Sequence, residues 1–107
     1  MSGDTEAAAE AYQKALELNP SQVKPHIQLC ALRGQEGRLD EAAQYCQQAL
    51  ELSPNEYQAH RNLAILYRDM GRTEDALVEA RVARELASEE EKQDWDTFIS
   101  QLEGTAE

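Results

Sequence analysis

ALELNP, residues 15–20, returns as ALELSP at residues 49–54, so that Pro54 follows Pro20 by 34 positions. Small and apolar residues elsewhere in the chain keep the same spacing. They form the sets Gly3, Gly37 and Gly71; Ala8, Ala42 and Ala76; Ala15, Ala49 and Ala83; and Leu18, Leu52 and Leu86. Such a period is typical of a helix-turn-helix unit that buries its apolar face by stacking on copies of itself. We therefore interpret the repeated hexapeptide as the last turn of a helix and the proline that stops it.

Within one period the apolar residues predict two helices separated by a glycine. The first helix covers about residues 56–70, and Gly71 follows it as a residue able to end a helix in the left-handed conformation. The two apolar stripes comprise Ala59, His60, Leu63, Ala64 and Tyr67, and then Ala76, Leu77, Ala80, Ala83 and Leu86. Alanines at the contact allow two helix axes to approach closely. The two stripes should therefore form one core.

Two successive segments share one pattern of residues. It comprises His60, Leu63, Ala64, Tyr67, Ala76, Ala80 and Ala83 in one, and His26, Leu29, Cys30, Arg33, Ala42, Cys46, Ala49 and Pro54 in the other. Over residues 3–88 the chain resembles the tetratricopeptide repeat, although histidine stands where that family often has tryptophan and Ser88 replaces the last proline. The resemblance implies an all-α fold of antiparallel helix-turn-helix repeats stacked as a right-handed α-solenoid. It also implies a concave face that binds a segment of another protein.

The period predicts how the single domain, residues 1–107, is organised. We expect a half repeat at 1–20, full repeats at 21–54 and 55–88, a capping helix at 89–104 and a tail at 105–107. The half repeat holds only a second helix, residues 4–18, because Gly3 aligns with the glycines between helices. This favours the C-terminal part of a longer protein, and the alternative is a complete small protein that starts with a half repeat.

The segment after the last repeat has the pattern of a helix that seals the array. Ser88 and Glu91 have the spacing of a capping box. Trp95, Phe98, Ile99 and Leu102 then form one apolar face, and Gly104 is the predicted stop. We expect this face to cover the last repeat, and the alternative is that Trp95 and Phe98 form a binding stripe for another protein.

Composition excludes several classes of function. The chain has 21 acidic and 10 basic residues, a formal net charge of -11, which disfavours nucleic acid and direct membrane contact. Cys30 and Cys46 lie among apolar residues, so we expect them to be buried, reduced and unpaired. The sequence shows no metal-ligand spacing, no phosphate-binding loop and no catalytic arrangement. We therefore expect no enzymatic activity, no metal and no cofactor.

The remaining prediction concerns the concave face lined by the first helix of each repeat. Its expected residues are Lys24, Ile27, Gln28, Ala31, Gln58, Arg61, Asn62, Ile65 and Arg68. Three of these are basic and none is acidic, which favours an acidic or carboxylate-ended protein or peptide as the partner. The family's receptors for carboxylate-ended chaperone tails are disfavoured, because Ile27 and Ala31 stand where that subset has lysine and asparagine. Two alternatives remain open: self-assembly into a homo-oligomer through residues 4–18, and a regulatory appendage of a larger enzyme or membrane protein.

Overall fold

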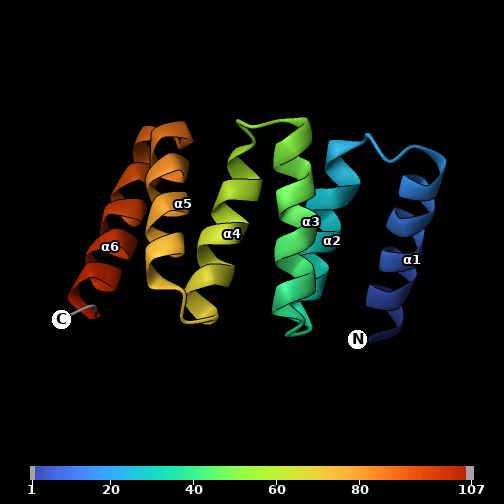
Figure 1. The fold of residues 1–107 in the computed structure, drawn as a ribbon, viewed down its shortest axis with the longest axis horizontal. Coiled ribbons are helices and arrows are strands. Elements are labelled where there is room, and N and C mark those ends of the chain that lie inside the picture. The colour runs from blue at the N-terminus through green and yellow to red at the C-terminus, as the bar shows by residue number, and fades with distance from the viewer. Residues whose placement is uncertain (1, 106–107) are drawn as a thin grey trace. The chain divides into compact units, whose positions relative to one another are not determined.

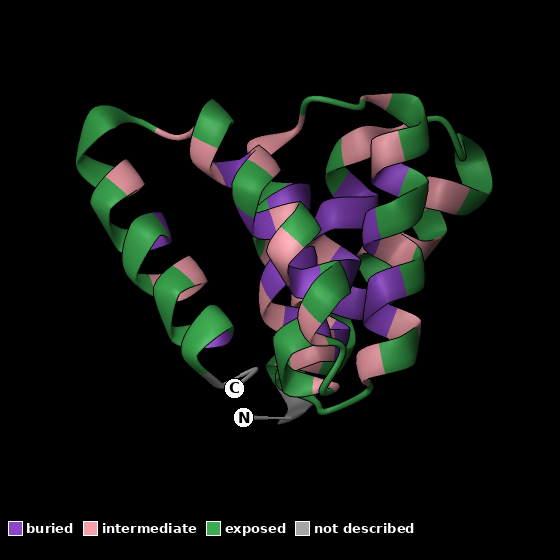
Figure 2. Cartoon of the chain, turned by 60° about the vertical axis from the view of Figure 1, so that its left-hand side comes forward, coloured by how far each residue is buried: buried purple, intermediate pink, exposed green. Residues whose placement is uncertain are grey.

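The computed structural model describes residues 2–105, and within that range the chain forms six helices and no strand (Figure 1). It divides into two compact units, the first ending at Pro54 and the second starting at Asn55. Each helix presents an exposed side and a buried side (Figure 2), as expected for amphipathic helices. No helix among the described residues has both the length and the apolar character needed to cross a membrane.

The first unit contains α1 (Ser2–Leu18), α2 (Val23–Gln35) and α3 (Leu39–Leu52). In this unit α1 packs on α2, and α2 packs on α3. The Gln22 side chain closes the turn after α1, because its Nε2 donates to the carbonyl oxygens of Ala15 at 2.8 Å and Asn19 at 3.1 Å. The Ala15 oxygen also accepts the backbone N–H of Asn19 at 3.0 Å, so the Gln22 side chain ties the residues after α1 to the last turn of the helix.

The start of α1 differs from the prediction. The helix begins at Ser2 instead of residue 4, so Gly3 lies inside it and does not form a turn. Gly37 and Gly71, which align with Gly3, do separate two helices. Gly3 is not among the described glycines with positive φ, so the helix passes through it.

The cysteines correct a second prediction. Cys30 of α2 and Cys46 of α3 form a disulfide, and neither is a free thiol. Their Cα atoms are 5.4 Å apart, within the roughly 4.4–6.8 Å that a disulfide spans. The prediction of burial is confirmed, since Cys30 is 1% exposed and Cys46 is 0% exposed. The pairing arises because α2 and α3 pack as neighbours around Gly37, which places residues on either side of the turn opposite each other.

The second unit contains α4 (Tyr57–Asp69), α5 (Thr73–Leu86) and α6 (Glu89–Thr105). Helix α4 matches the predicted range of 56–70 to within one residue at each end. The core of this unit includes Ala64, Ala80, Ala83 and Trp95. Trp95 is 6% exposed, so α6 covers the last repeat as expected. Leu86 was expected in the core but is 38% exposed, because it lies at the last residue of α5.

The turns after α2 and α4 have the same hydrogen bonds. The N–H of Arg38 donates to Arg33 and that of Gly37 donates to Gly34, while Arg72 and Gly71 repeat the pair one period later. Gly37 and Gly71 have φ of 81° and 78°. This combination is the Schellman motif, in which a left-handed residue lets the chain leave the helix. The sequence period is therefore reproduced in backbone geometry.

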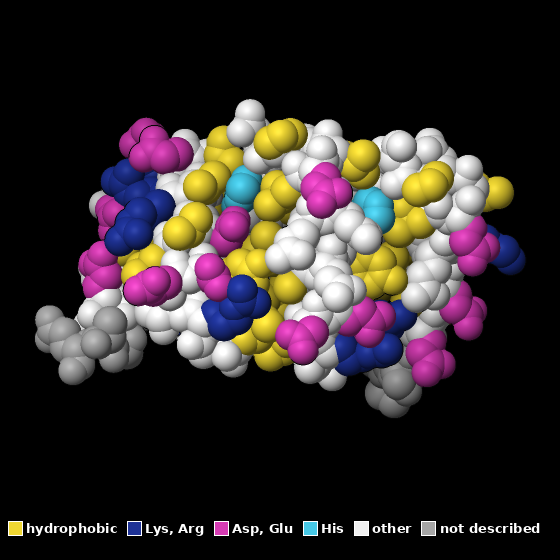
Figure 3. All heavy atoms as spheres, viewed as in Figure 1, with side chains coloured by type: hydrophobic (Ala, Val, Ile, Leu, Met, Phe, Trp, Pro, Cys, Tyr) yellow, Lys and Arg dark blue, Asp and Glu magenta, His cyan; other side chains and the backbone are white. Residues whose placement is uncertain are grey.

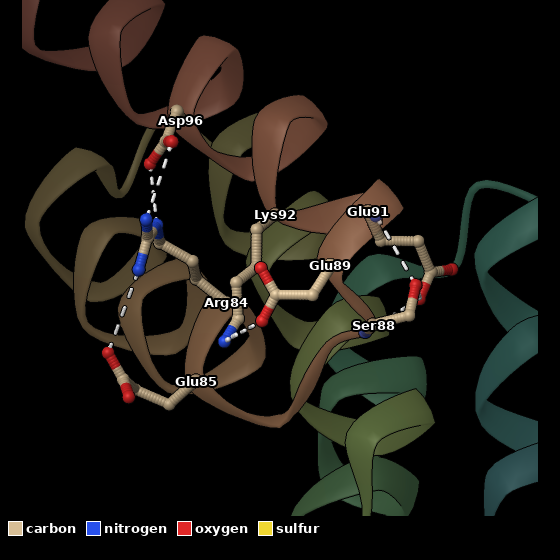
Figure 4. Close-up of polar contacts among 7 residues, drawn as sticks. All are labelled: Arg84, Glu85, Ser88, Glu89, Glu91, Lys92 and Asp96. Carbon is tan, nitrogen blue, oxygen red and sulfur yellow. Dashed lines mark hydrogen bonds and ion pairs between the residues drawn. The ribbon is translucent and has the colours of Figure 1, made fainter.

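The junction between α5 and α6 is held by polar contacts (Figure 4). The backbone N–H of Glu91 donates to Ser88 Oγ at 3.3 Å and that of Ser88 donates to Glu91 Oε1 at 3.4 Å, which confirms the capping box. Arg84 Nε donates to Asp96 Oδ1 at 2.6 Å. This hydrogen bond raises the pKa of Arg84 above its ordinary value, so its charge is constant over any working pH.

The end of α6 differs from the prediction. The helix continues to Thr105, so Gly104 does not stop it and Thr105 does not belong to a tail. Gly104 is not among the described residues with positive φ, which is why it continues the helix. The rest of the predicted tail, residues 106–107, lies outside the described residues.

Candidate functional site

A cleft of about 330 Å³ lies between α4 and α6 in the second unit. Helix α4 provides one wall and α6 provides the other. The lining residues are Tyr57, Arg61, Ile65, Arg68, Glu91, Asp94, Trp95 and Phe98. Those of α4 recur every three to four positions, and those of α6 lie within one turn on either side of the adjacent pair Asp94 and Trp95, so each set falls on one side of its helix. The cleft therefore follows from the helical period of two short segments.

Aromatic side chains form the apolar part of the cleft. Trp95 Nε1 donates to the Tyr57 hydroxyl at 3.0 Å, and the two rings meet edge to face at 90°. Phe98 lies 5.2 Å from Trp95 between ring centroids. Such pairs add to area burial through their edge-to-face geometry. The indole N–H is already satisfied, so this part of the cleft offers apolar surface and no free donor from Trp95.

The charged groups at the cleft differ in how far they are already paired. Arg68 donates to Asp69 Oδ1 at 3.1 Å, and its guanidinium carbon stands 5.3 Å from the centre of the Phe98 ring. Glu91 belongs to the capping box at Ser88. Arg61 donates to Asn62 Oδ1 at 3.3 Å and forms no ion pair with a carboxylate of the described residues. Asp94 likewise has no ion pair in the described part of the chain.

The structure brings three of the nine predicted groove residues into this cleft. Arg61, Ile65 and Arg68 line it, whereas Gln58 and Asn62 lie elsewhere on α4. The other four belong to α2 in the first unit: Lys24, Ile27, Gln28 and Ala31. Ile27 is only 6% exposed, so little of its side chain is available to a ligand, and Lys24 is exposed.

The contribution of α6 to the cleft was considered only as an alternative, a binding stripe of Trp95 and Phe98, and the candidate site did not include Glu91 and Asp94. Glu91, Asp94, Trp95 and Phe98 have helical spacing, and this signal was present in the sequence. The apolar residues of this segment were expected to cover the last repeat. The cleft also includes the acidic residues Glu91 and Asp94 beside two arginines, so its charge is mixed. More generally, basic side chains lie beside acidic ones on the face shown in Figure 3. The ion pairs Arg72–Asp75 and Arg81–Glu103 are further examples of mixed charge in this unit.

Comparison with known proteins establishes the family. Residues 35–94, more than half of the chain, match the tetratricopeptide repeat, and residues 2–22 match it again. The chain belongs to the tetratricopeptide repeat family. No curated protein matches the sequence significantly.

Solved structures of other tetratricopeptide-like helical repeat proteins share the fold. SycD, the Yersinia enterocolitica type III secretion chaperone in complex with a peptide of the translocator YopD, has a TM-score of 0.88 at 20% identity, over 99% of this chain and 85% of SycD. PcrH in complex with the chaperone-binding region of PopD has a TM-score of 0.88 at 17% identity, over 99% of this chain and 84% of PcrH. MamA (AMB-1) is 36% identical with a TM-score of 0.72, over 78% of this chain and 50% of MamA. The predicted class, an all-α helical repeat of the solenoid type, is confirmed.

The buried polar residues of this tetratricopeptide chain have partners in neighbouring segments of their own unit. His26 Nε2 lies 3.1 Å from the Pro20 carbonyl oxygen, and His60 Nδ1 lies 2.7 Å from Glu79 Oε1. Arg33 donates to Glu36 at 2.9 Å, a hydrogen bond that raises the pKa of Arg33. The Arg33–Glu36 contact stabilises the end of α2, and the His60–Glu79 contact joins α4 to α5. Among the described residues no group of three or more His, Cys, Asp or Glu side chains could hold a metal ion.

Proposed function

We propose that this chain is a non-catalytic interaction module that binds a segment of a partner protein at the first helix of its full repeats, α2 or α4. The cleft between α4 and α6 is the observation that carries the proposal, because it joins an aromatic and aliphatic surface to an arginine, Arg61, that forms no ion pair among the described residues. Membership of the tetratricopeptide repeat family supports it, as do the peptide complexes of SycD and PcrH. Three of the nine predicted groove residues, Arg61, Ile65 and Arg68, line this cleft.

The chemistry of the cleft supports a short contact and not a deep small-molecule pocket. Its volume of about 330 Å³ is near the lower end of the roughly 300–1,000 Å³ of ligand pockets. Ile65 and Phe98 are each partly exposed, which gives an apolar side chain of a ligand surface to cover. Arg61 can donate charge-assisted hydrogen bonds, which are stronger than neutral ones. A partner segment would insert one apolar side chain and place an acceptor beside Arg61.

A peptide-array screen and pull-down with the wild type and an Arg61→Ala, Arg68→Ala double variant test this function. Lys14→Ala on α1 is the matched control, since it removes an exposed cation from the first unit. We expect the double variant to lose most of the captured segments and the control to keep them. Binding should also weaken with salt, because exposed charges are screened over about 10 Å at 0.1 M. Equal capture by a folded double variant would remove these arginines from the proposal.

A second candidate, self-association through α1, is favoured by one observation. Leu18 at the end of α1 is 85% exposed, and Ala7 and Ala11 on the same helix are exposed as well. Light scattering over a range of concentrations separates the two functions. A specific oligomer that dissociates in the Leu18→Lys variant would support self-association. A monomer at all concentrations would rule it out and leave the interaction module as the remaining proposal.

A further inference from the structure

We infer that the cleft between α4 and α6 selects a dipolar segment: one apolar side chain flanked by an acidic group on one side and a basic group on the other. This inference rests on the proposed function and names the chemistry of the ligand. It replaces the acidic or carboxylate-ended partner that was predicted from the basic residues of α2 and α4 alone. The argument depends on which charges of the cleft are still available to a ligand.

Two of the four charged side chains at the cleft are already engaged. Arg68 bonds to Asp69 and stacks on Phe98, so a ligand would have to compete with both contacts. Glu91 bonds to the Ser88 side chain and N–H at the start of α6. Binding a ligand through Glu91 would therefore open the capping box at the start of α6.

The two remaining charges have opposite sign and belong to opposite walls. Arg61 on α4 and Asp94 on α6 are both exposed, and neither forms an ion pair within residues 2–105. A ligand with two carboxylates would meet Asp94 as a like charge, and a ligand with two cations would meet Arg61. A dipolar ligand satisfies both charges at once. Like-charge contacts of this kind suppress binding of the wrong partners.

Between the two walls the cleft offers apolar surface. Ile65 and Phe98 are partly buried, and the indole N–H of Trp95 is taken up by the Tyr57 hydroxyl. A polar side chain inserted here would lose water and gain no hydrogen bond from Trp95. The central side chain of the ligand should therefore be apolar.

Four synthetic peptides test the inference directly. Each has a central leucine in a glycine and serine background, flanked by Asp and Lys, by Lys and Asp, by two Asp, or by two Lys. Trp95 is the only tryptophan of the chain and lines the cleft, so its fluorescence reports binding without a label. We expect one of the two dipolar peptides to bind at least tenfold more tightly than the doubly acidic and doubly basic peptides.

Charge reversal gives the sharper test. Asp94→Lys should shift the preference to the doubly acidic peptide, and Arg61→Glu should shift it to the doubly basic one. The matched control is Glu90→Lys, which makes the same change on an exposed residue of α6 outside the cleft. The inference is overturned if the doubly acidic peptide binds as tightly as the dipolar ones, or if Asp94→Lys changes the preference no more than Glu90→Lys does. Either outcome overturns the dipolar selectivity but not the proposed interaction module. If none of the four peptides binds and the Arg61→Ala, Arg68→Ala variant captures the same segments as the wild type, both proposals are overturned.

Discussion

Reduction of the Cys30–Cys46 disulfide should destabilise the chain by an amount that follows from its position. The two cysteines are 16 positions apart. For a closed loop of about that length, the loss of unfolded-state entropy stabilises the folded state by about 3 kcal/mol at 25 °C. The unfolding entropy of 107 residues is about 0.22 kcal/mol/K at an average of about 2.1 cal/mol/K per residue. Reduction should therefore lower the thermal midpoint by about 13 °C.

The assay is thermal and urea unfolding followed by circular dichroism, with and without a reductant. Both cysteines are buried, so the reduced sample must be unfolded with reductant and then refolded in its presence. A Cys30→Ala, Cys46→Ala double variant serves as control, because its midpoint should not respond to the reductant. Thiol titration of the untreated protein in denaturant should find no free thiol.

Two results would refute this reasoning. One is the titration of two thiols in denaturant without reductant, which would show that Cys30 and Cys46 are free, as predicted from the sequence. The other is an unchanged midpoint on reduction of a verified disulfide, which would mean that the crosslink does not restrict the unfolded chain.

Further predictions concern the second unit. Trp95→Ala should lower the free energy of unfolding by about 3–5 kcal/mol, measured by urea unfolding with circular dichroism, and a loss under 1 kcal/mol would contradict the burial of Trp95. Deletion of residues 89–107 should uncover Ala80 and Ala83, lower the midpoint and cause aggregation; a truncated chain with the parent midpoint would show that α6 has no capping role. Glu79→Ala removes an acceptor 2.7 Å from His60 and should cost about 1–3 kcal/mol. Glu79→Gln keeps an acceptor and should recover most of that loss, and equal loss in both variants would argue against the hydrogen bond.

The sequence predicted the class of fold because the period is long, regular and carried by residues that decide packing. Ala42, Ala76 and Ala83 recur where helices touch, and all three are fully buried. The C-terminal end of α4 was predictable because Gly71 is the only glycine near it and can take the left-handed conformation that ends a helix. The start of α1 was harder to predict, because the sequence alone does not distinguish a glycine inside a helix from a glycine in a turn.

The disulfide and the cleft escaped prediction for a common reason. Each of Cys30 and Cys46 was placed on the correct apolar stripe, but their meeting depends on how two stripes face each other across a turn. In the same way, Arg61, Ile65 and Arg68 follow from the spacing along one helix. The presence of Asp94 and Phe98 beside them depends on the placement of α6, which spacing within a helix does not determine.

The left-handed turns at Gly37 and Gly71 have a consequence for chirality. Nothing lies within 4 Å of the position where an L side chain would begin at either residue. An L-alanine there would meet no steric obstacle from neighbouring residues, and its cost would come from its own backbone, about 1–2 kcal/mol. A D-amino acid adopts positive φ as readily as an L-amino acid adopts negative φ. A chemically synthesised chain with D-alanine at these two exposed positions should keep the fold and gain stability over glycine, because the unfolded chain has fewer conformations to lose. At these two points the mirror-image residue should suit the backbone better than any residue that ribosomal synthesis supplies, glycine included.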